Sequence, residues 1–263
     1  MGLLSFLGIG GGKSGSLDRH AARARNKDAQ SVDRFGSLEA LAGAAHDEVK
    51  AADKGDATLR GKAVLGLLGR FTMRYDKTIE DEQEKDYVFA QLSSLGSSIL
   101  PELERHLHAA ESISWGLRLL GEIATVDEAW PILERLCERN DNNYTRDPSK
   151  KTQLVHYLGE QSDPRAGEAL VPYLEDVDEG VRFTAVEGIL SLLPASAREP
   201  LFRRLADAGE HSRRIKRRIV EGMADAGWDI RSGAAKLDDS AIADLLPGAT
   251  VDKQGRVRRG PDK

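Results

Sequence analysis

The chain has 263 residues, of which 40% are hydrophobic, 31% are charged and 5% are aromatic, and its formal net charge is −5. Its length and apolar content allow a sizeable buried core, which excludes a fully disordered protein. Scarce aromatic residues disfavour a β-sandwich, and the negative charge disfavours a protein that coats nucleic acid with its whole surface. The one cysteine, Cys137, excludes an internal disulfide and a multi-cysteine metal site.

Targeting and membrane signals are weak in this sequence. No apolar run approaches the ~18 residues that a transmembrane helix needs. The start of the chain, residues 1–7, lacks the basic region and the full apolar stretch of a signal peptide. We therefore expect a cytoplasmic protein.

The chain divides into three parts by composition. Residues 1–16 read as an apolar tip, Leu3 to Leu7, followed by a flexible Gly/Ser linker. Residues 17–230 read as a helical body, and 231–263 as a short helix followed by a disordered basic tail. Apolar residues recur at three and four positions, which predicts helices over 17–27, 31–45, 57–71, 79–95, 98–109, 112–123, 127–138, 149–160, 165–175, 180–192, 197–208, 212–226 and 238–246. We expect Asp163 to cap the helix that Pro164 begins.

Two markers recur along the helical body. Glycines lie within alternate helices, and prolines open the helices between them, each at intervals of roughly 30 to 40 residues: Gly121, Gly159, Gly188 and Gly222, and Pro101, Pro131, Pro172 and Pro200. A helix pair of this size cannot bury its apolar faces alone, so the pattern predicts an all-α fold of about six stacked antiparallel pairs. Glycine inside a helix costs about 1 kcal/mol relative to alanine, so we expect the four glycines to mark close contacts between helices.

The segments 158–174 and 178–189 contain the clearest repeat motifs of the sequence. The first contains an Asp-Pro-Arg turn at Asp163, and the second contains Val181-Arg182 followed by Ala185-Val186-Glu187. These segments resemble HEAT repeats, most strongly over 97–225, and the whole chain is similar to uncharacterised bacterial HEAT-repeat proteins. The resemblance implies an armadillo-like α-solenoid with A helices on its convex side and B helices on its concave side. It implies no activity that can be transferred to this chain.

A basic cluster near the C-terminal end is the most informative candidate site. Arg214, Arg217 and Arg218 fall at i, i+3 and i+4 of one helix and therefore share a face, opposite Ile215 and Ile219. The cluster predicts an anion-binding patch, or alternatively a solvated face of the last repeat. It also includes Arg203, Arg204, His211, Arg213 and Lys216, and the tail residues Lys253, Arg256, Arg258 and Arg259 could extend it.

Further partner-binding candidates lie on the proline-opened helices, which we expect to be the B helices of a concave surface. They combine charges of both signs with one aromatic residue: Glu102, Arg105, Glu134, Arg135, Tyr173 and Glu175, together with Arg203 and Arg204. The acidic stretch from Asp76 contrasts with the basic C-terminal repeat and suggests an oriented complex.

No motif points to catalysis, to a cofactor or to a metal site. Gly12-Lys13-Ser14 lacks the leading glycine of a P-loop. We expect Cys137 to be a small buried hydrophobic residue instead of a reactive thiol.

The sequence therefore favours a non-enzymatic scaffold or adaptor for a protein partner whose identity it does not reveal. One alternative is binding of nucleic acid or another anion at the basic repeat, as in the HEAT-like DNA glycosylases. A second is a lyase acting on a small ligand, as in the HEAT-like bilin lyases. The first alternative rests on the basic cluster, whereas the likeness to these two enzyme classes holds only at the level of the fold.

Overall fold

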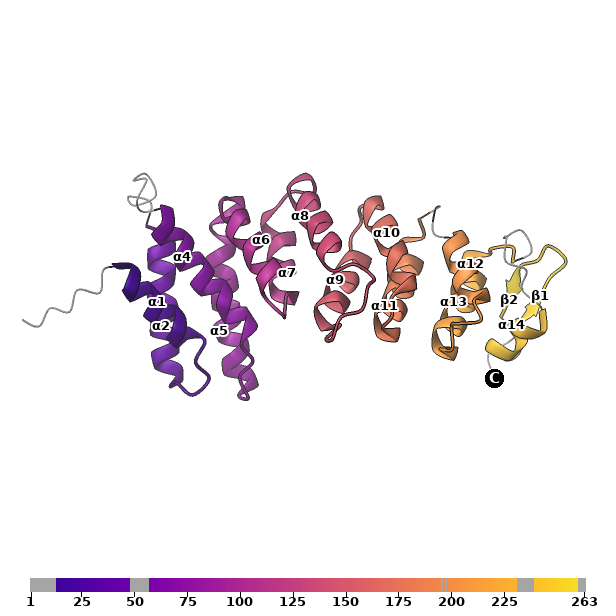
Figure 1. Ribbon diagram of the computed structural model, residues 1–263, viewed down its shortest axis with the longest axis horizontal. Helices are drawn as coiled ribbons and strands as arrows, with labels where there is room; N and C mark the ends of the chain where they lie inside the picture. The colour runs from indigo at the N-terminus through magenta and orange to yellow at the C-terminus, as the bar shows by residue number, and fades with distance from the viewer. Residues whose placement is uncertain (1–12, 48–56, 195, 197, 231–238, 260–263) are drawn as a thin grey trace, which may run out of the picture. The chain divides into compact units, whose positions relative to one another are not determined.

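The computed structural model describes residues 13–47, 57–194, 196, 198–230 and 239–259 (Figure 1). Thirteen α-helices and two short strands make up the regular structure of these ranges, with three short 3-10 turns. The prediction of an all-α fold is confirmed. No helix of the described ranges is long and apolar enough to cross a membrane.

The chain forms two compact units, Met1–Ile132 and Leu133–Lys263. Within the first unit, α1, α2 and α4 pack on one another, α5 lies against α2 and α7, and α6 lies against α4 and α7. The helices thus alternate between two rows within the unit. Its helices are α1 (Lys13–Ala24), α2 (Ser31–Ala45), α4 (Ala57–Leu68), α5 (Thr78–Ser93), α6 (Leu100–Ala109) and α7 (Ser114–Ile123), and the boundary between the units falls within α8 (Val126–Arg139).

The second unit repeats this alternation. Helix α11 packs against α9 on one side and α13 on the other, while the 3-10 turn Val171–Glu175 and α12 lie together in the other row. Its elements are α9 (Ser149–Gly159), α10 (Pro164–Leu170), α11 (Glu179–Leu192), α12 (Arg198–Ala206), α13 (Arg213–Ala226), α14 (Asp239–Leu245), β1 (Thr250–Val251) and β2 (Val257–Arg258).

Local capping behaves as the sequence predicts. The carboxylate of Asp163 accepts a hydrogen bond of 2.8 Å from the backbone N–H of Arg165, and Pro164 begins α10. Asp178 caps α11 and Ser212 caps α13 in the same way. Each cap satisfies one backbone N–H that has no partner within its own helix.

Close contacts between helices explain three of the four internal glycines, Gly159, Gly188 and Gly222. A Cβ atom added to Gly188 of α11 would lie 2.9 Å from the Cα atom of Gly159 in α9 and 2.8 Å from Cδ1 of Leu170. Gly222 of α13 faces the side chain of Leu190 at similarly close range. Gly121, in contrast, is exposed, so the prediction of a close contact is wrong there.

A buried ion network joins α2, the 3-10 turn Gly69–Thr72 and α5. The side chains of Arg34 and Arg70 are fully buried. Both donate to the Glu84 carboxylate, Arg34 Nε at 3.1 Å and Arg70 Nε at 2.8 Å. Arg70 Nη2 also donates to Asp81 Oδ1 at 2.7 Å, and Lys85 Nζ donates to Asp81 Oδ2 at 2.6 Å. Two buried carboxylates therefore pair with three buried cations, and Glu80 Oε2 adds a further negative charge 4.0 Å from Arg34 Nη2.

A second chain of ion pairs connects successive helices of the Leu133–Lys263 unit. Lys151 Nζ on α9 donates to Asp176 Oδ2 at 2.7 Å, and Arg182 Nη1 on α11 donates to the Asp176 carbonyl at 2.8 Å. Arg182 Nε also donates to Glu210 Oε2 at 2.8 Å, and Arg204 Nε on α12 lies 3.6 Å from the same oxygen. Buried carboxylates thus link elements about 30 residues apart.

Both ends of the described chain differ from the prediction. Helix α1 begins at Lys13, so residues 13–16 are helical and not part of a linker, because Leu17 and Ala24 are buried where α1 meets α2 and α4. The predicted apolar tip at 3–7 lies outside the described residues.

The predicted disordered tail is also corrected, because β1 and β2 form an antiparallel hairpin. Asp252 Oδ1 accepts from the backbone N–H groups of Gln254 and Arg256, each at 2.9 Å, and Gly255 has a φ of 78°. An aspartate followed three residues later by glycine forms the tight turn, and burial of Val257 holds the hairpin in place.

Glu84→Gln should lower the free energy of unfolding by about 3–5 kcal/mol, because two buried guanidinium groups lose their shared negative charge. Urea denaturation followed by circular dichroism measures the change. Glu82→Gln, at an exposed position of the same helix, is the matched control and should change stability by less than about 0.5 kcal/mol. Equal stability of the two variants would contradict an essential role for the network.

Gly188→Ala should destabilise the protein by about 1–3 kcal/mol, because the added methyl group would press on the backbone of Gly159. Gly43→Ala in α2 is the control, since no atom lies within 4 Å of its added Cβ. That substitution should stabilise by about 0.4–1 kcal/mol through the unfolded chain. Thermal unfolding of both variants checks the opposite signs.

We expect the free energy of unfolding to fall at acidic pH, partly because Glu210 becomes protonated. Burial raises the pKa of Glu210, but the hydrogen bonds from Arg182 and from the Ser212 N–H and the charges of Arg182 and Arg204 lower it below its ordinary value of 4.5. A lowered folded-state pKa contributes stability above the unfolded pKa, and this contribution is lost as the pH falls through the folded pKa.

Glu210→Gln should therefore cost about 2 kcal/mol at pH 7, and its difference from the unaltered chain should shrink as the pH falls below 4.5. Urea titrations across this pH range measure both effects. The exposed Glu168→Gln of α10 serves as control. A difference that stays constant with pH would contradict the assignment.

Candidate functional site

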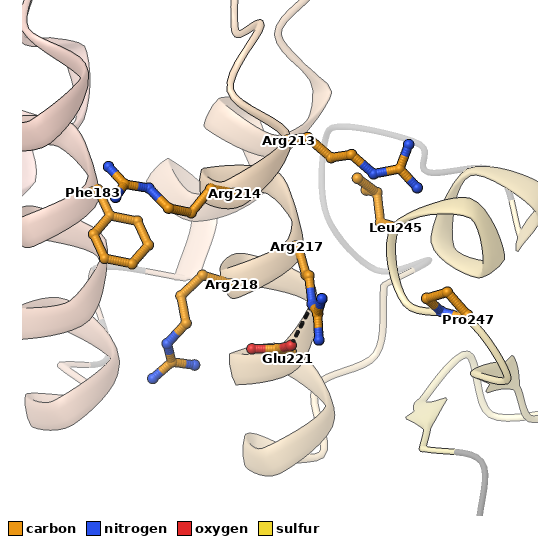
Figure 2. A pocket seen from close by; sticks show the side chains of 8 residues that line it. All are labelled: Phe183, Arg213, Arg214, Arg217, Arg218, Glu221, Leu245 and Pro247. Carbon is orange, nitrogen blue, oxygen red and sulfur yellow. Dashed lines mark hydrogen bonds and ion pairs between the residues drawn. The ribbon is translucent and has the colours of Figure 1, made fainter. Parts of the chain in front are cut away.

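Helix α13 presents its arginines to a cavity of about 530 Å³ (Figure 2). We call this cavity the arginine pocket. One wall comes from α13, a second from Phe183 of α11, and a third from Leu245 and Pro247 at the end of α14. Its lining residues are Phe183, Arg213, Arg214, Arg217, Arg218, Glu221, Leu245 and Pro247.

The packing of α13 decides which of its side chains reach the pocket. Ile215, Ile219 and Met223 are fully buried and fix the inner face of the helix, as the apolar stripe predicts. Arg214, Arg217 and Arg218 follow on the other side at helical spacing. All three arginines line the arginine pocket, which agrees with the prediction that they share one face of the helix.

Acidic partners hold three of the four guanidinium groups in place. Arg214 Nη2 lies 3.0 Å from both carboxylate oxygens of Glu179, and its Cζ atom lies 4.0 Å from the centre of the Phe183 ring. Arg217 Nε donates to Glu221 Oε1 at 2.8 Å. Arg218 pairs with Glu187 of α11.

Arg213 is held differently, since its Nη2 donates to the backbone carbonyl of Asp244 in α14. Four guanidinium groups thus meet three carboxylates, those of Glu179, Glu187 and Glu221. The pocket keeps a local excess of positive charge on pre-oriented donors, which suits an anionic ligand with an apolar part.

The structure separates other predicted cationic residues from this pocket. Arg203 is exposed on α12, whereas Arg204 is buried and donates to the Leu174 carbonyl at 3.1 Å. The prediction that Arg204 binds a partner is wrong, because the ion-pair chain of the second unit uses its side chain. In the tail, Arg258 pairs with Asp252 and Arg259 with Asp225.

The candidates near Pro101, Pro131, Pro172 and Pro200 differ in burial, and Pro131 lies inside α8 instead of opening it as predicted. Tyr173 is 2% exposed, and its hydroxyl donates to the Asn140 carbonyl at 2.8 Å, so its prediction as a contact residue is wrong. Glu175 is exposed but accepts from Arg204 at 2.9 Å. Among the others, Glu102 is half-buried, while Arg105, Glu134 and Arg135 are exposed.

Four pocket residues were missed by the sequence reasoning: Phe183, Glu221, Leu245 and Pro247. Glu221 stands four residues after Arg217, a spacing that does predict an ion pair on one helix face. Phe183 directly follows the Val181-Arg182 pair of the repeat motif. Its contact with the Arg214 guanidinium group depends on how α11 packs against α13. No local signal places Leu245 and Pro247 beside α13.

Nucleophilic and metal chemistry have little support in the described part of the chain. Cys137 is half-buried, and burial raises the pKa of its thiol, although a hydrogen bond between its side chain and that of Tyr173 opposes the shift. A raised pKa leaves little reactive thiolate at neutral pH. Within the same residues, no group of three or more His, Cys, Asp or Glu side chains is placed to share a metal ion.

No known family model matches the chain, and no curated protein is significantly similar to it.

Proposed function

We propose that the chain is a HEAT-like α-solenoid that acts as a non-enzymatic scaffold, and that its arginine pocket binds an acidic segment of a protein partner. Two features of the fold support the repeat assignment. Helices alternate between two rows within each unit. The aspartate-capped helices α10 and α11 lie within the segments 158–174 and 178–192 that include the HEAT-like sequence motifs. Helical repeats of this kind bind proteins through extended surfaces instead of one reactive group.

One observation carries the proposed ligand preference: four arginines of a single helix line one cavity that also has an apolar wall. Arginine offers up to five N–H donors, so each ion pair with a carboxylate leaves further donors for a ligand. Leu245 and Pro247 can contact aliphatic or aromatic side chains of a bound segment. An acidic peptide with interspersed apolar residues supplies both kinds of group.

Nucleic acid fits the same pocket less well. Glu221 lines the cavity, and Glu179 and Glu187 neutralise two of its arginines. Binding of a phosphate backbone depends on many uncompensated cations. The Phe183 ring is covered by Arg214, so it offers no free platform on which a base could stack.

Small-ligand catalysis finds little support in the pocket lining. Apart from Glu221, its ionisable lining residues are arginines, which stay protonated and cannot act as general bases. The Glu221 carboxylate is engaged by Arg217. This composition favours binding over acid–base chemistry.

Replacing Arg214, Arg217 and Arg218 together by glutamate should weaken binding of a labelled peptide of alternating glutamate and leucine by at least about tenfold. Fluorescence polarisation at two salt concentrations measures the affinity. A second triple variant, with glutamine at the same positions, avoids repulsion of Glu179 and should show a smaller loss. Circular dichroism confirms that each variant is folded.

The control replaces Arg19, Arg23 and Arg74 by glutamate, which changes the net charge equally at exposed positions outside the pocket. An equal loss in this control would mean that overall charge, and not the pocket, governs binding. Tighter binding of duplex DNA than of the peptide, weakened by salt and by the pocket substitutions, would favour the nucleic-acid alternative. Failure of every acidic probe to bind would refute the proposal.

A further inference from the structure

A second cavity of about 270 Å³ lies within the Met1–Ile132 unit, where α1, α2 and α4 meet. We call it the α1/α2/α4 groove. Its walls include Leu17 and His20 of α1, Ala40 and Ala44 of α2, and Leu59 and Arg60 of α4. Small side chains on α2 keep the groove open, because a larger residue at Ala40 or Ala44 would occupy it.

The groove combines an apolar lining with positive charge. Leu17, Ala40, Ala44 and Leu59 provide hydrophobic contact, while the titratable lining residues, His20 and Arg60, are both basic side chains. Such a surface complements a ligand that carries an aliphatic group close to a negative charge.

Neighbouring atoms fix the orientation of the Arg60 side chain. Its Nε donates to the Ala45 carbonyl at 3.2 Å, and its Nη2 donates to the Ser98 hydroxyl at 2.8 Å. Both of these acceptors are neutral, so the two bonds hold the guanidinium group without cancelling its charge. A fixed cation at the edge of an apolar groove is pre-organised to receive a carboxylate.

We propose that this groove captures the C-terminus of a partner protein that ends in a leucine-like residue. The last side chain lies between Ala40, Ala44 and Leu59, and the terminal carboxylate meets Arg60, with His20 as a second donor. This proposal does not depend on the arginine pocket, which lies in the other unit.

The size of the groove selects this ligand among apolar anions. A volume of about 270 Å³ falls below the ~300–1,000 Å³ typical of small-molecule pockets, so the groove suits one aliphatic side chain and not a long acyl chain. A glutamate or aspartate side chain would bring charge without filling the apolar walls. A C-terminal leucine carries both groups on one Cα atom, and capture of a terminal carboxylate is a recurrent mode of peptide recognition.

The test measures binding of a labelled peptide ending in Gly-Gly-Leu with a free carboxylate, and of the same peptide with an amidated end, to the full chain. We expect the acid to bind at least about tenfold more tightly than the amide. A third peptide, ending in lysine with a free carboxylate, should bind as weakly as the amide. Equal affinities for the acid and the amide would overturn the proposal.

Substitutions in the α1/α2/α4 groove test whether the peptide binds there. Ala40→Leu and Ala44→Leu, made separately, each fill the groove at little helical cost and should reduce affinity for the acid at least about tenfold. Ala90→Leu, at an exposed position of α5, is the matched control. Arg60→Gln should bring the affinity for the acid to that for the amide, while Arg74→Gln, at an exposed position outside the groove, should leave the preference intact. Undiminished binding by both groove-filling variants would overturn the proposal.

Two further outcomes separate this inference from its alternatives. The Arg214, Arg217 and Arg218 triple variant should bind the leucine peptide normally, so failure of the arginine pocket leaves this test unaffected. If a Leu4→Asp/Phe6→Asp variant bound the peptide at least about tenfold more tightly than the unaltered chain, the chain's own N-terminal segment would be the occupant. That outcome would overturn the assignment to a partner protein.

Discussion

Buried pairing between guanidinium groups and carboxylates is the constraint on which the arrangement of helices depends. In the Met1–Ile132 unit, Arg34 and Arg70 share Glu84, and in the other unit Arg182 and Arg204 lie around Glu210. Burying these charges is costly unless every partner is in place. Leucine-rich helix faces can pack in several registers, whereas a paired charge tolerates few. We infer that the ion pairs select one register between neighbouring helices.

The same constraint shapes the arginine pocket. Because Ile215 and Ile219 pack into the core on the inner face of α13, the arginines of this helix lie on its outer side. Glu179 and Glu187 of α11 then orient two of them, while Arg213 reaches back to α14. One set of side chains therefore connects adjacent helices and also forms a cationic cavity.

Residues that look alike in the sequence reach different environments. Arg203 and Arg204 are neighbours on α12, yet the first is exposed and the second is buried. The acidic stretch from Asp76 suggested a surface for an oriented complex, but Asp81 and Glu84 within it pair with buried cations. Burial of these side chains depends on helices that approach from elsewhere in the chain, so composition alone does not reveal it.

The sequence by itself determined the helices, the Asp163 cap and the shared face of Arg214, Arg217 and Arg218, because hydrophobic period and capping act over a few neighbouring residues. Only the tertiary structure decided that Tyr173 and Arg204 are buried, that Gly188 meets Gly159, and that Leu245 and Pro247 close one side of the arginine pocket. These contacts join residues about 30 positions apart. Their energies depend on how helices pack, which no local pattern specifies.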